Sequence, residues 1–422
     1  MHRHQPQPKP RNGLVAALDI GSTKVSCLIA RKEGTRPPRV IGVGHHASAG
    51  VKNGTIVDME QAEATVRAAV GAAEEMAGAN IESVFVSLTG TAFNSRLVAY
   101  DINISGHEIG DQDLRKILDA TRLTQSLPQD QEIVHSIPVG YSIDGNRGVR
   151  DPRGMFGDSL GVNLHVVTAQ TNALRNIDTC LHRCHLDVDG HVVSPYASAM
   201  SALVEDEMKL GVTLVDMGGG TTNISVFFDG ELMHADCIPV GGMNVTNDIA
   251  RGLSTPVQHA ERMKTLYGNC MPSPKDDLEV LKVQLIGEEQ TGETNEVPRS
   301  MLVGIIRPRL EETFELVRDR LHGAGFERLS GPRLVLTGGA SLLPGVRELA
   351  GEILGKDQVR MAKPRYLEGM AEVASGPQFS ACAGLVNYAY ETAEETLGRT
   401  YRPKEQPASR FGKIGQWLRD NF

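Results

Sequence analysis

Two segments of the sequence end an apolar run with an aspartate and then continue into glycine and small polar residues. Leu14 to Lys24 reads LVAALDIGSTK, and Gly211 to Thr222 reads GVTLVDMGGGTT. Glycine lets backbone N–H groups come close to a phosphate, and an aspartate at a strand end can hold a Mg²⁺-bound water through its hard oxygen atoms. One such segment alone could equally be a tight hairpin turn. Because Asp19 and Asp216 hold equivalent places in two similar segments, the pair predicts a phosphate and magnesium site.

Two further glycine turns follow the second hairpin. Pro239 to Gly242, PVGG, precedes Asn244 at a predicted helix start, where backbone N–H groups could face an anion. Arg333 to Ser341, RLVLTGGAS, is a predicted strand that ends in Gly338 and Gly339. No segment has the GxxxxGK[ST] pattern of a Walker A loop. The sequence therefore predicts that phosphate is bound by turns of a different type.

The segments between these turns alternate between strand-like and helix-like patterns, so we predict an α/β fold. Asp58 to Ala77 is a predicted helix, and Asp111 is placed to cap another. A compact α/β insertion is predicted near residues 89–163. The other predicted helices are 111–123, 172–185, a small-residue helix ending near 201, 256–267, 300–323, 345–354 and 379–394. The predicted strands are 40–43, 83–88, 96–104, 132–143, 164–169, 224–228, 232–237 and 278–286.

The composition excludes several classes of protein. With 422 residues, 40% hydrophobic and 23% charged, the chain is an ordinary globular protein of two or more domains. Its net charge of −9 argues against a general nucleic-acid binder. Six scattered cysteines favour a reducing cytoplasm. Residues 1–12 are polar and proline-rich, unlike a signal peptide, and no apolar run approaches the roughly 20 residues that cross a bilayer.

The sequence LHRCH places cysteine and histidine together at Cys180, His182, Cys184 and His185. On a helix, Cys180 and Cys184 share one face while His182 points elsewhere. No second pair of ligands follows at zinc spacing. We therefore expect these cysteines to pack in a core and predict no metal site here.

The C-terminal end changes character. Residues 395–409 are polar, contain two prolines and are predicted to be a disordered linker. Residues 410–422, RFGKIGQWLRDNF, place large apolar side chains on one helical face, and the chain from Arg399 onward carries a net charge of +4. This composition is typical of a helix that lies on an anionic membrane surface. The predicted membrane-binding residues are Phe411, Lys413, Ile414, Trp417, Leu418, Arg419 and Phe422.

Two glycines within this helix, Gly412 and Gly415, each cost about 1 kcal/mol of helix stability, so we expect it to fold only on lipid. One copy then binds weakly and reversibly, whereas many copies on a polymer would bind firmly through avidity. The alternative is that this helix docks on its own domain or on a partner protein.

The motifs LDIGSTK, VDMGGGTTNI, PVGG, AERMKTLYG and LTGGAS, together with the amphipathic end, resemble the FtsA family of actin-like bacterial cell-division proteins. This family belongs to the superfamily of actin, hexokinase and heat-shock chaperones. The resemblance covers residues 13 to 422. It implies a two-lobed actin-like fold in which two related ribonuclease-H-like domains flank a nucleotide cleft, with an inserted α/β subdomain called 1C and a C-terminal amphipathic helix.

The resemblance also implies how the chain is divided into subdomains. Residues 1–12 would be a disordered N-terminus, and residues 89–163 would form subdomain 1C. In this family subdomain 1C replaces a subdomain of actin and lies on the opposite side of the molecule. Subdomain 1A comprises residues 13–88, 164–199 and 376–394. Subdomain 2A comprises 200–248 and 300–375, and subdomain 2B comprises 249–299. A linker at 395–409 then leads to the membrane-targeting helix at 410–422.

By the same resemblance, the site would bind ATP and Mg²⁺. Asp19 and Asp216 would serve the Mg²⁺ shell through water. The first phosphate motif would be Gly21, Ser22, Thr23 and Lys24, and the second would be Gly218, Gly219, Gly220, Thr221, Thr222 and Asn223. Glu261 and Lys264 would meet the ribose and adenine, and the cleft would be completed by Gly241, Gly242, Asn244, Gly338, Gly339 and Ala340.

No catalytic residue is predicted. Hydrolysing members of the superfamily place a glutamate or glutamine ahead of the second hairpin to orient the attacking water. The matching position lies near Ser194, where the sequence has neither. We therefore expect ATP binding with slow hydrolysis or none.

The function implied by the resemblance is an ATP-binding, polymer-forming protein that tethers the ring of the tubulin-like protein FtsZ to the cytoplasmic face of the inner membrane at the division site. Its partners would be the C-terminal tail of FtsZ through subdomain 2B, further copies of itself, anionic lipid and the division proteins that arrive later, but no nucleic acid.

Other members of the superfamily fit the sequence less well. A sugar kinase would need a catalytic aspartate in a substrate pocket and would have no use for a basic tail. A heat-shock chaperone would need a peptide-binding domain. An actin-like scaffold of pilus assembly or cell shape is the nearest alternative, and the insertion and C-terminal anchor favour division.

Overall fold

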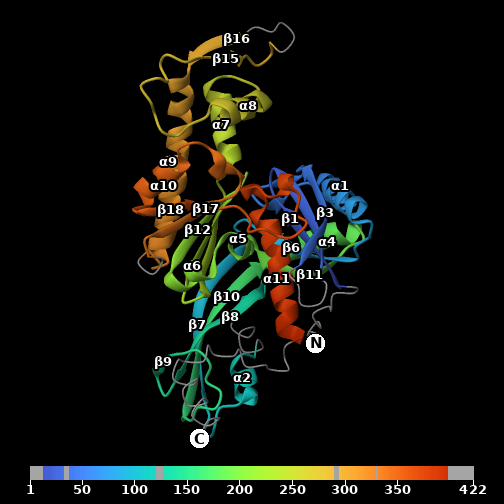
Figure 1. Cartoon of the computed structure of the whole chain (residues 1–422), viewed down its shortest axis with the longest axis vertical. Helices are drawn as coiled ribbons and strands as arrows, with labels where there is room; N and C mark the ends of the chain where they lie inside the picture. The colour runs from blue at the N-terminus through green and yellow to red at the C-terminus, as the bar shows by residue number, and fades with distance from the viewer. Residues whose placement is uncertain (1–12, 33–37, 120–126, 289–293, 328–330, 398–422) are drawn as a thin grey trace, which may run out of the picture.

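The computed structural model describes residues 13–32, 38–119, 127–288, 294–327 and 331–397, and Figure 1 shows two lobes with an inserted unit at one end. Each lobe contains a five-stranded sheet. The first sheet has the spatial order β11 (Asp187–Val193), β6 (Ser83–Leu88), β1 (Leu14–Ile20), β2 (Lys24–Arg31) and β3 (Arg39–Ala47). The second has the order β18 (Gln358–Met361), β17 (Arg333–Thr337), β12 (Val212–Met217), β13 (Thr222–Phe228) and β14 (Glu231–Ile238).

The two sheets repeat one topology. In the first, β1 pairs antiparallel with β2 and parallel with β6. In the second, β12 pairs antiparallel with β13 and parallel with β17. The prediction of an α/β fold with two related domains is therefore confirmed.

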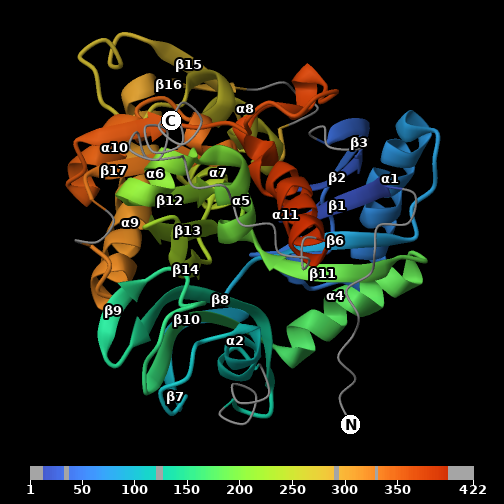
Figure 2. The same ribbon diagram turned by 60° about the horizontal axis from the view of Figure 1, so that its bottom comes forward.

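Helices cover both faces of the first sheet because alternate side chains of β1 point to opposite sides. Ala16, Leu18 and Ile20 share a core with α1 (Met59–Ala77) and α4 (Thr171–Arg183), whereas Val15 and Ala17 share a core with α11 (Ser380–Leu397) (Figure 2). The predicted helix starting at residue 58 is confirmed, since Asp58 caps α1 by accepting a hydrogen bond of 3.1 Å from the Gln61 N–H. A short hairpin of β4 (Val51–Lys52) and β5 (Thr55–Ile56) precedes it.

The second lobe follows the same plan. Val215 and Met217 of β12 pack against α7 (Gly242–Gly252), α9 (Arg299–Gly323) and α10 (Val346–Leu354), while Val212 and Leu214 pack toward α5 (Ser194–Ala202). The short helix α6 (Glu205–Leu210) precedes β12. Beyond α7 lie α8 (Val257–Tyr267) and a hairpin of β15 (Val280–Gln284) and β16 (Thr294–Pro298), at the end of the molecule opposite the insertion. β16 was not predicted.

Helices α5 and α11 join the two lobes. Ala197 of α5 belongs to the core of the first lobe, and Ala199 and Ala202 belong to that of the second. A side chain at Gly384 of α11 would lie 1.6 Å from the Ala197 carbonyl oxygen, so only glycine allows this approach. At the start of α11, Ser380 shares a 2.7 Å hydrogen bond between hydroxyl groups with Thr337 of β17. The base of α11 therefore contacts both lobes.

The insertion is a unit with its own core. Its sheet has the order β7 (Phe93–Asn103), β10 (Ser159–Gln170), β8 (Gln131–Ile143) and β9 (Asn146–Val149), and α2 (Asp111–Ile117) packs on it (Figure 2). β10 begins five residues before the predicted strand at 164–169. Leu160 and Val162 are buried in this core and alternate with Gly161 and Asn163, two residue types that are uncommon in strands and so make this part of β10 hard to recognise from the sequence.

Three predicted details differ from the structure. The cap of α2 is Gly110 rather than Asp111, and the Asp113 carboxylate accepts a 3.1 Å hydrogen bond from the Gly110 N–H. The predicted boundary between residues 163 and 164 falls within β10, and that between 248 and 249 falls within α7. Among the described helices, none is long and apolar enough to cross a lipid bilayer. The predicted linker and amphipathic helix at 398–422 and the N-terminal residues 1–12 lie outside the described residues.

Candidate functional site: a cavity between the lobes

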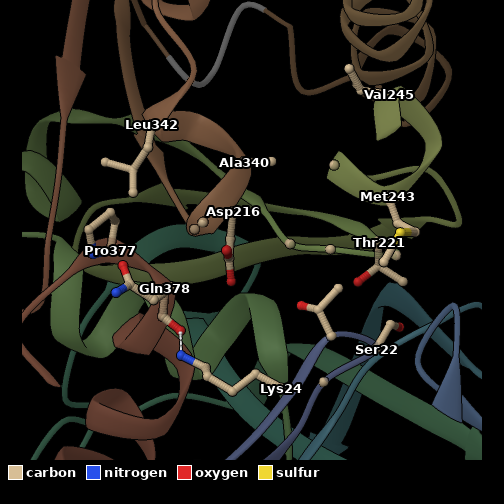
Figure 3. Close-up of a pocket in the computed structure, with 18 of the residues that line it drawn as sticks. Ser22, Lys24, Asp216, Thr221, Met243, Val245, Ala340, Leu342, Pro377 and Gln378 are labelled. Atoms are coloured by element: carbon tan, nitrogen blue, oxygen red, sulfur yellow. Dashed lines mark hydrogen bonds between the residues drawn. The ribbon is translucent and has the colours of Figure 1, made fainter. Parts of the chain in front are cut away.

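The two glycine hairpins face each other across a cavity of about 550 Å³ (Figure 3). It is lined from the first lobe by the β1–β2 turn and from the second lobe by the β12–β13 turn, the start of α7 and the TGGA turn. Most of the predicted nucleotide-binding residues border it. These are Asp19, Gly21, Ser22, Thr23, Lys24, Asp216, Gly218, Gly219, Gly220, Thr221, Asn223, Gly242, Glu261, Lys264, Gly338, Gly339 and Ala340.

The hairpins approach so closely that glycine is required in the second one. A side chain at Gly219 would have its Cβ 2.3 Å from Thr23 Cγ2, and one at Gly220 would have its Cβ 2.5 Å from Ser22 Oγ. Real Cβ atoms do not make contacts this short, so the three-glycine turn is what lets the lobes meet here.

Two carboxylates, the half-buried Asp19 and the buried Asp216, lie at the floor of the cavity. Asp19 at the end of β1 accepts a 2.6 Å hydrogen bond from the Ser87 hydroxyl, and Asp216 at the end of β12 accepts one from the Ser198 hydroxyl of α5. Burial raises the pKa of Asp216 to about 6 in spite of the Ser198 hydrogen bond, and nearby Asp19 raises it further. Burial also raises the pKa of Asp19. Such a pair of carboxylates is costly to keep ionised without a cation.

Lys24 supplies positive charge at this floor. Its Nζ donates a 2.9 Å hydrogen bond to the Gln378 carbonyl oxygen, drawn as a dashed line in Figure 3, and lies 3.3 Å from the centroid of the Phe379 ring. Burial lowers the pKa of its ammonium group, and the carboxylates of Asp19 and Asp216 partly offset that shift. The ammonium group therefore contacts the segment that precedes α11 and interacts with the two carboxylates only through longer-range electrostatic attraction.

The far end of the cavity is built differently. Lys264 of α8 is hydrogen-bonded to the Glu261 carboxylate at 2.7 Å, to the Thr246 hydroxyl at 2.8 Å and to the Gly242 carbonyl oxygen at 3.1 Å. The remaining wall is mostly apolar and consists of Met243, Val245, Leu310, Leu342, Leu343 and Pro344. An apolar wall beside one carboxylate and one ammonium group suits a flat ring that carries polar edges.

Three predicted site residues do not border the cavity. Thr222 is fully buried, and its hydroxyl donates a 2.8 Å hydrogen bond to the Val240 carbonyl oxygen. The Asn244 side chain accepts a 3.0 Å hydrogen bond from the Gly241 N–H and so fixes the start of α7. These three residues therefore support the lining of the cavity from behind, because they fix the second hairpin and the start of α7.

Sequence reasoning missed Thr89. Its hydroxyl donates a 3.1 Å hydrogen bond to the Asn223 side chain and lies 3.3 Å from the Thr221 hydroxyl, so it links the lobes at the edge of the cavity. A signal was present, because Thr89 follows strand β6, which runs parallel to β1, and parallel strands bring their carboxyl ends to one edge. Pro377, Gln378 and Ala381 were missed as well, and no motif marks them in the sequence.

Ser194 also borders the cavity, at the first turn of α5. It is buried, and its hydroxyl has no hydrogen-bond partner among the described residues. Every carboxylate and amide side chain that lines the cavity lies elsewhere, on residues Asp19, Asp216, Asn223, Glu261 and Gln378.

The Cys180 and Cys184 pair packs as predicted. Cys180 is fully buried in the core shared by α1, α4 and β1, and Cys184 packs against that core. In the described part of the chain, no group of three or more histidine, cysteine, aspartate or glutamate side chains is arranged to hold a metal ion.

Comparisons with solved structures identify the fold. A chain of the PilM–PilN type IV pilus biogenesis complex is similar with a TM-score of 0.62 and 16% sequence identity, over 90% of this chain and 98% of that one. MreB5 of Spiroplasma citri bound to ADP is similar with a TM-score of 0.54 and 12% identity, over 92% of this chain and 99% of that one. These likenesses confirm the actin-like fold.

Comparisons of sequence identify the family. Residues 213–384 match the model of the family described as cell division protein FtsA, and residues 90–168 match that of the SHS2 domain inserted in FtsA. The cell division protein FtsA of Rhizobium meliloti is 45% identical over 100% of this chain and 97% of its own length. That of Pseudomonas aeruginosa is 36% identical over 97% of this chain and 98% of its own length. The chain therefore belongs to the FtsA family of actin-like cell-division proteins.

Proposed function

We propose that this chain binds ATP with Mg²⁺ between its lobes and forms a polymer that tethers the FtsZ ring to the cytoplasmic face of the inner membrane at the division site. The observation that supports the nucleotide part is the pair of hairpins that line one cavity, with Asp19 and Asp216 together at its floor. The phosphates would lie between the β1–β2 turn and the β12–β13 turn, and Lys24 would neutralise part of their charge.

The donor atoms at the floor of the cavity fit Mg²⁺. This ion keeps several of its waters and is held by one or two carboxylates together with substrate phosphates. Asp19 and Asp216 supply two carboxylates whose pKa is raised by their removal from solvent, and the charge of Lys24 offsets only part of that shift. When bound, Mg²⁺ would supply that charge and neutralise the phosphates.

The adenine and ribose would lie at the far end, against the apolar wall and near Glu261 and Lys264. Hydrolysis is proposed to be slow or absent. Ser194 lies near the position at which hydrolysing members of the superfamily have a carboxylate or amide, and its hydroxyl is a weaker base for orienting water. Nucleotide would then serve mainly to set the relative position of the lobes within a polymer.

The proposed FtsZ contact lies in subdomain 2B, at residues 249–299. Apolar side chains that are at least 40% exposed gather along this part of the chain and the adjoining start of α9: Val257, Leu266, Tyr267, Leu278, Val280, Ile286 and Met301. Leu278 is 83% exposed. A concentration of exposed apolar side chains favours a protein-binding surface, here for the C-terminal tail of FtsZ.

This contact predicts the effect of single substitutions. Ile286→Ser should weaken binding of a peptide with the FtsZ C-terminal sequence about tenfold, since removal of one anchoring side chain costs about 1.4 kcal/mol. The matched control is Leu210→Ser, because Leu210 is also 63% exposed but lies on α6 at the other end of the lobe. Fluorescence anisotropy measures both, and an equal loss in the two variants would contradict the assignment.

The membrane part of the proposal is tested by flotation with anionic liposomes. The full chain is compared with a version that ends at Gln406, each with and without ATP. The full chain should float at least tenfold more than the shortened version, and ATP should increase flotation of the full chain only, because polymerisation multiplies the number of weak anchors. If both versions stay in the soluble fraction, the tail docks on protein and the tethering role fails.

A further inference from the structure

Phe379 lies behind the floor of the cavity, at the end of the 3₁₀ turn that precedes α11. The two residues before it, Pro377 and Gln378, border the cavity, whereas Phe379 does not. Its side chain is only 3% exposed, and its ring meets that of His45 on β3 edge to face, with the ring centroids 5.8 Å apart. The ring therefore reaches the site only through the side chain that contacts it from the cavity.

That side chain is Lys24. Its Nζ lies 3.3 Å from the centroid of the Phe379 ring, well inside the roughly 6 Å within which a ring face attracts a cation. The same Nζ donates a 2.9 Å hydrogen bond to the Gln378 carbonyl oxygen. An ammonium group has three N–H bonds. One is given to the carbonyl oxygen and another can point at the ring face, which leaves a donor for a phosphate oxygen in the cavity.

The two carboxylates at the floor make this position of Lys24 unexpected. Asp19 and Asp216 both attract the ammonium group, and a lysine side chain is flexible enough to follow such an attraction. In the described part of the chain, however, the direct contacts of Lys24 are with Gln378 and Phe379 rather than with either carboxylate. The ring and the carbonyl group therefore hold the cation apart from the carboxylates. This arrangement leaves the carboxylates available to Mg²⁺ and the ammonium group available to phosphate.

The ring itself is fixed from both sides along the chain. The Pro377 carbonyl oxygen accepts a 3.2 Å hydrogen bond from the Gly338 N–H of the second lobe. The Ser380 carbonyl oxygen accepts a 2.7 Å hydrogen bond from the Ser201 hydroxyl of α5. An aromatic side chain turns about only two bonds, fewer than the lysine stem. A buried ring whose backbone is fixed on both flanks can therefore define where a flexible lysine places its charge.

We propose that Phe379 is a positioning residue for phosphate binding. Its ring face holds the Lys24 ammonium group at the floor of the cavity, apart from Asp19 and Asp216, where a phosphate group of the nucleotide meets it. The inference rests on the proposed binding of ATP in this cavity. Because the ring touches no ligand and acts only through a cation, tyrosine should replace it, whereas an aliphatic side chain of similar size should not.

The first test is the affinity for ATP with Mg²⁺, measured by calorimetry on the full chain. Phe379→Leu and Phe379→Met keep an apolar side chain without a ring face, and each should weaken ATP binding about tenfold. Phe379→Tyr should stay within about twofold of the unchanged protein. Adenosine carries no phosphate, so its binding should not change. The matched control is Phe326→Leu, since Phe326 is also buried but stacks on His234 in the second lobe, and this variant should bind ATP normally.

The second test asks whether the ring acts through the ammonium group. Lys24→Met should itself weaken ATP binding about tenfold or more. Adding Phe379→Leu to Lys24→Met should then change the affinity by less than about twofold, because the cation that the ring holds is already gone. If Phe379 had only a structural role, the two losses would multiply.

Three results would overturn the inference while leaving the proposed function intact. The first is ATP binding in Phe379→Leu as tight as in the unchanged protein or tighter, which would mean that the ring merely competes with phosphate for Lys24. The second is an equal loss of adenosine binding, and the third is multiplied losses in the double variant. If the unchanged protein binds no ATP, the proposed function fails and this inference fails with it.

Discussion

Replacing Asp216 by asparagine should stabilise the nucleotide-free protein and at the same time weaken its binding of Mg²⁺ and ATP. In the folded protein the pKa of Asp216 is raised from 3.8 to about 6, so the folded state binds more protons than the unfolded state between these values. Stability is therefore lost as the pH rises through this window. A shift of about two units corresponds to about 3 kcal/mol of unfavourable free energy at pH 7 and above.

Asparagine removes this unfavourable contribution because it carries no charge, and its side-chain oxygen can still accept the Ser198 hydrogen bond. We expect the free energy of unfolding to rise by about 1–3 kcal/mol at pH 7.5 and the gain to disappear near pH 4, as measured by urea denaturation. The affinity for ATP in the presence of Mg²⁺ should fall at least tenfold in calorimetry. Asp357→Asn, at an exposed aspartate of the same lobe, is the control and should change neither quantity. A less stable Asp216→Asn protein that binds ATP normally would contradict the role given to Asp216.

Introducing a side chain into the three-glycine turn should have the largest effect on nucleotide binding. In Gly219→Val the new Cβ atom would lie only 2.3 Å from Thr23 Cγ2, so the two hairpins would have to move apart. Because the phosphates are proposed to lie between these hairpins, we expect the affinity for ATP to fall about 100-fold, equivalent to about 2.7 kcal/mol. The clash is between lobes, so each lobe should still fold.

A glycine elsewhere in the first lobe provides the control. A side chain at Gly71 of α1 would meet nothing within 4 Å, and alanine in a helix interior is more stable than glycine. Gly71→Ala should therefore bind ATP as the unchanged protein does and melt at the same or a higher temperature. Normal ATP affinity in Gly219→Val, with circular dichroism unchanged, would show that nucleotide does not bind between the hairpins.

The hairpins could be predicted because each combines a mostly buried strand, an aspartate near its end and glycines within a dozen residues, all visible in the local sequence. The fold follows from the same pattern repeated twice. Buried strands such as β6 and helices such as α1 were also recognised, since their apolar spacing and the cap at Asp58 are local features. β10 was only partly recognised, because Gly161 and Asn163 are residue types of low strand propensity and its burial depends on strands β7 and β8 on either side.

Residues that reach the cavity from distant parts of the chain could not be predicted in this way. Gln378 contributes a backbone carbonyl to Lys24, and any residue type could do so. Ser198 contacts Asp216 only because α5 packs between the two sheets. Such contacts depend on tertiary packing, and the spacing of residues along a single sequence does not reveal them.

The attachment of α11 at its base has a geometric consequence for the far end of that helix. Ser380 contacts Thr337, and the Gly338 N–H donates a 3.2 Å hydrogen bond to the Pro377 carbonyl oxygen, so the second lobe meets α11 only a few residues from the cavity. The 18 residues of α11 then extend for about 27 Å at 1.5 Å per residue. Each degree by which the second lobe turns about this contact displaces the far end of α11 by about 0.5 Å relative to that lobe. A closure of the cavity by ten degrees about this contact would move Leu397 by about 5 Å relative to the second lobe.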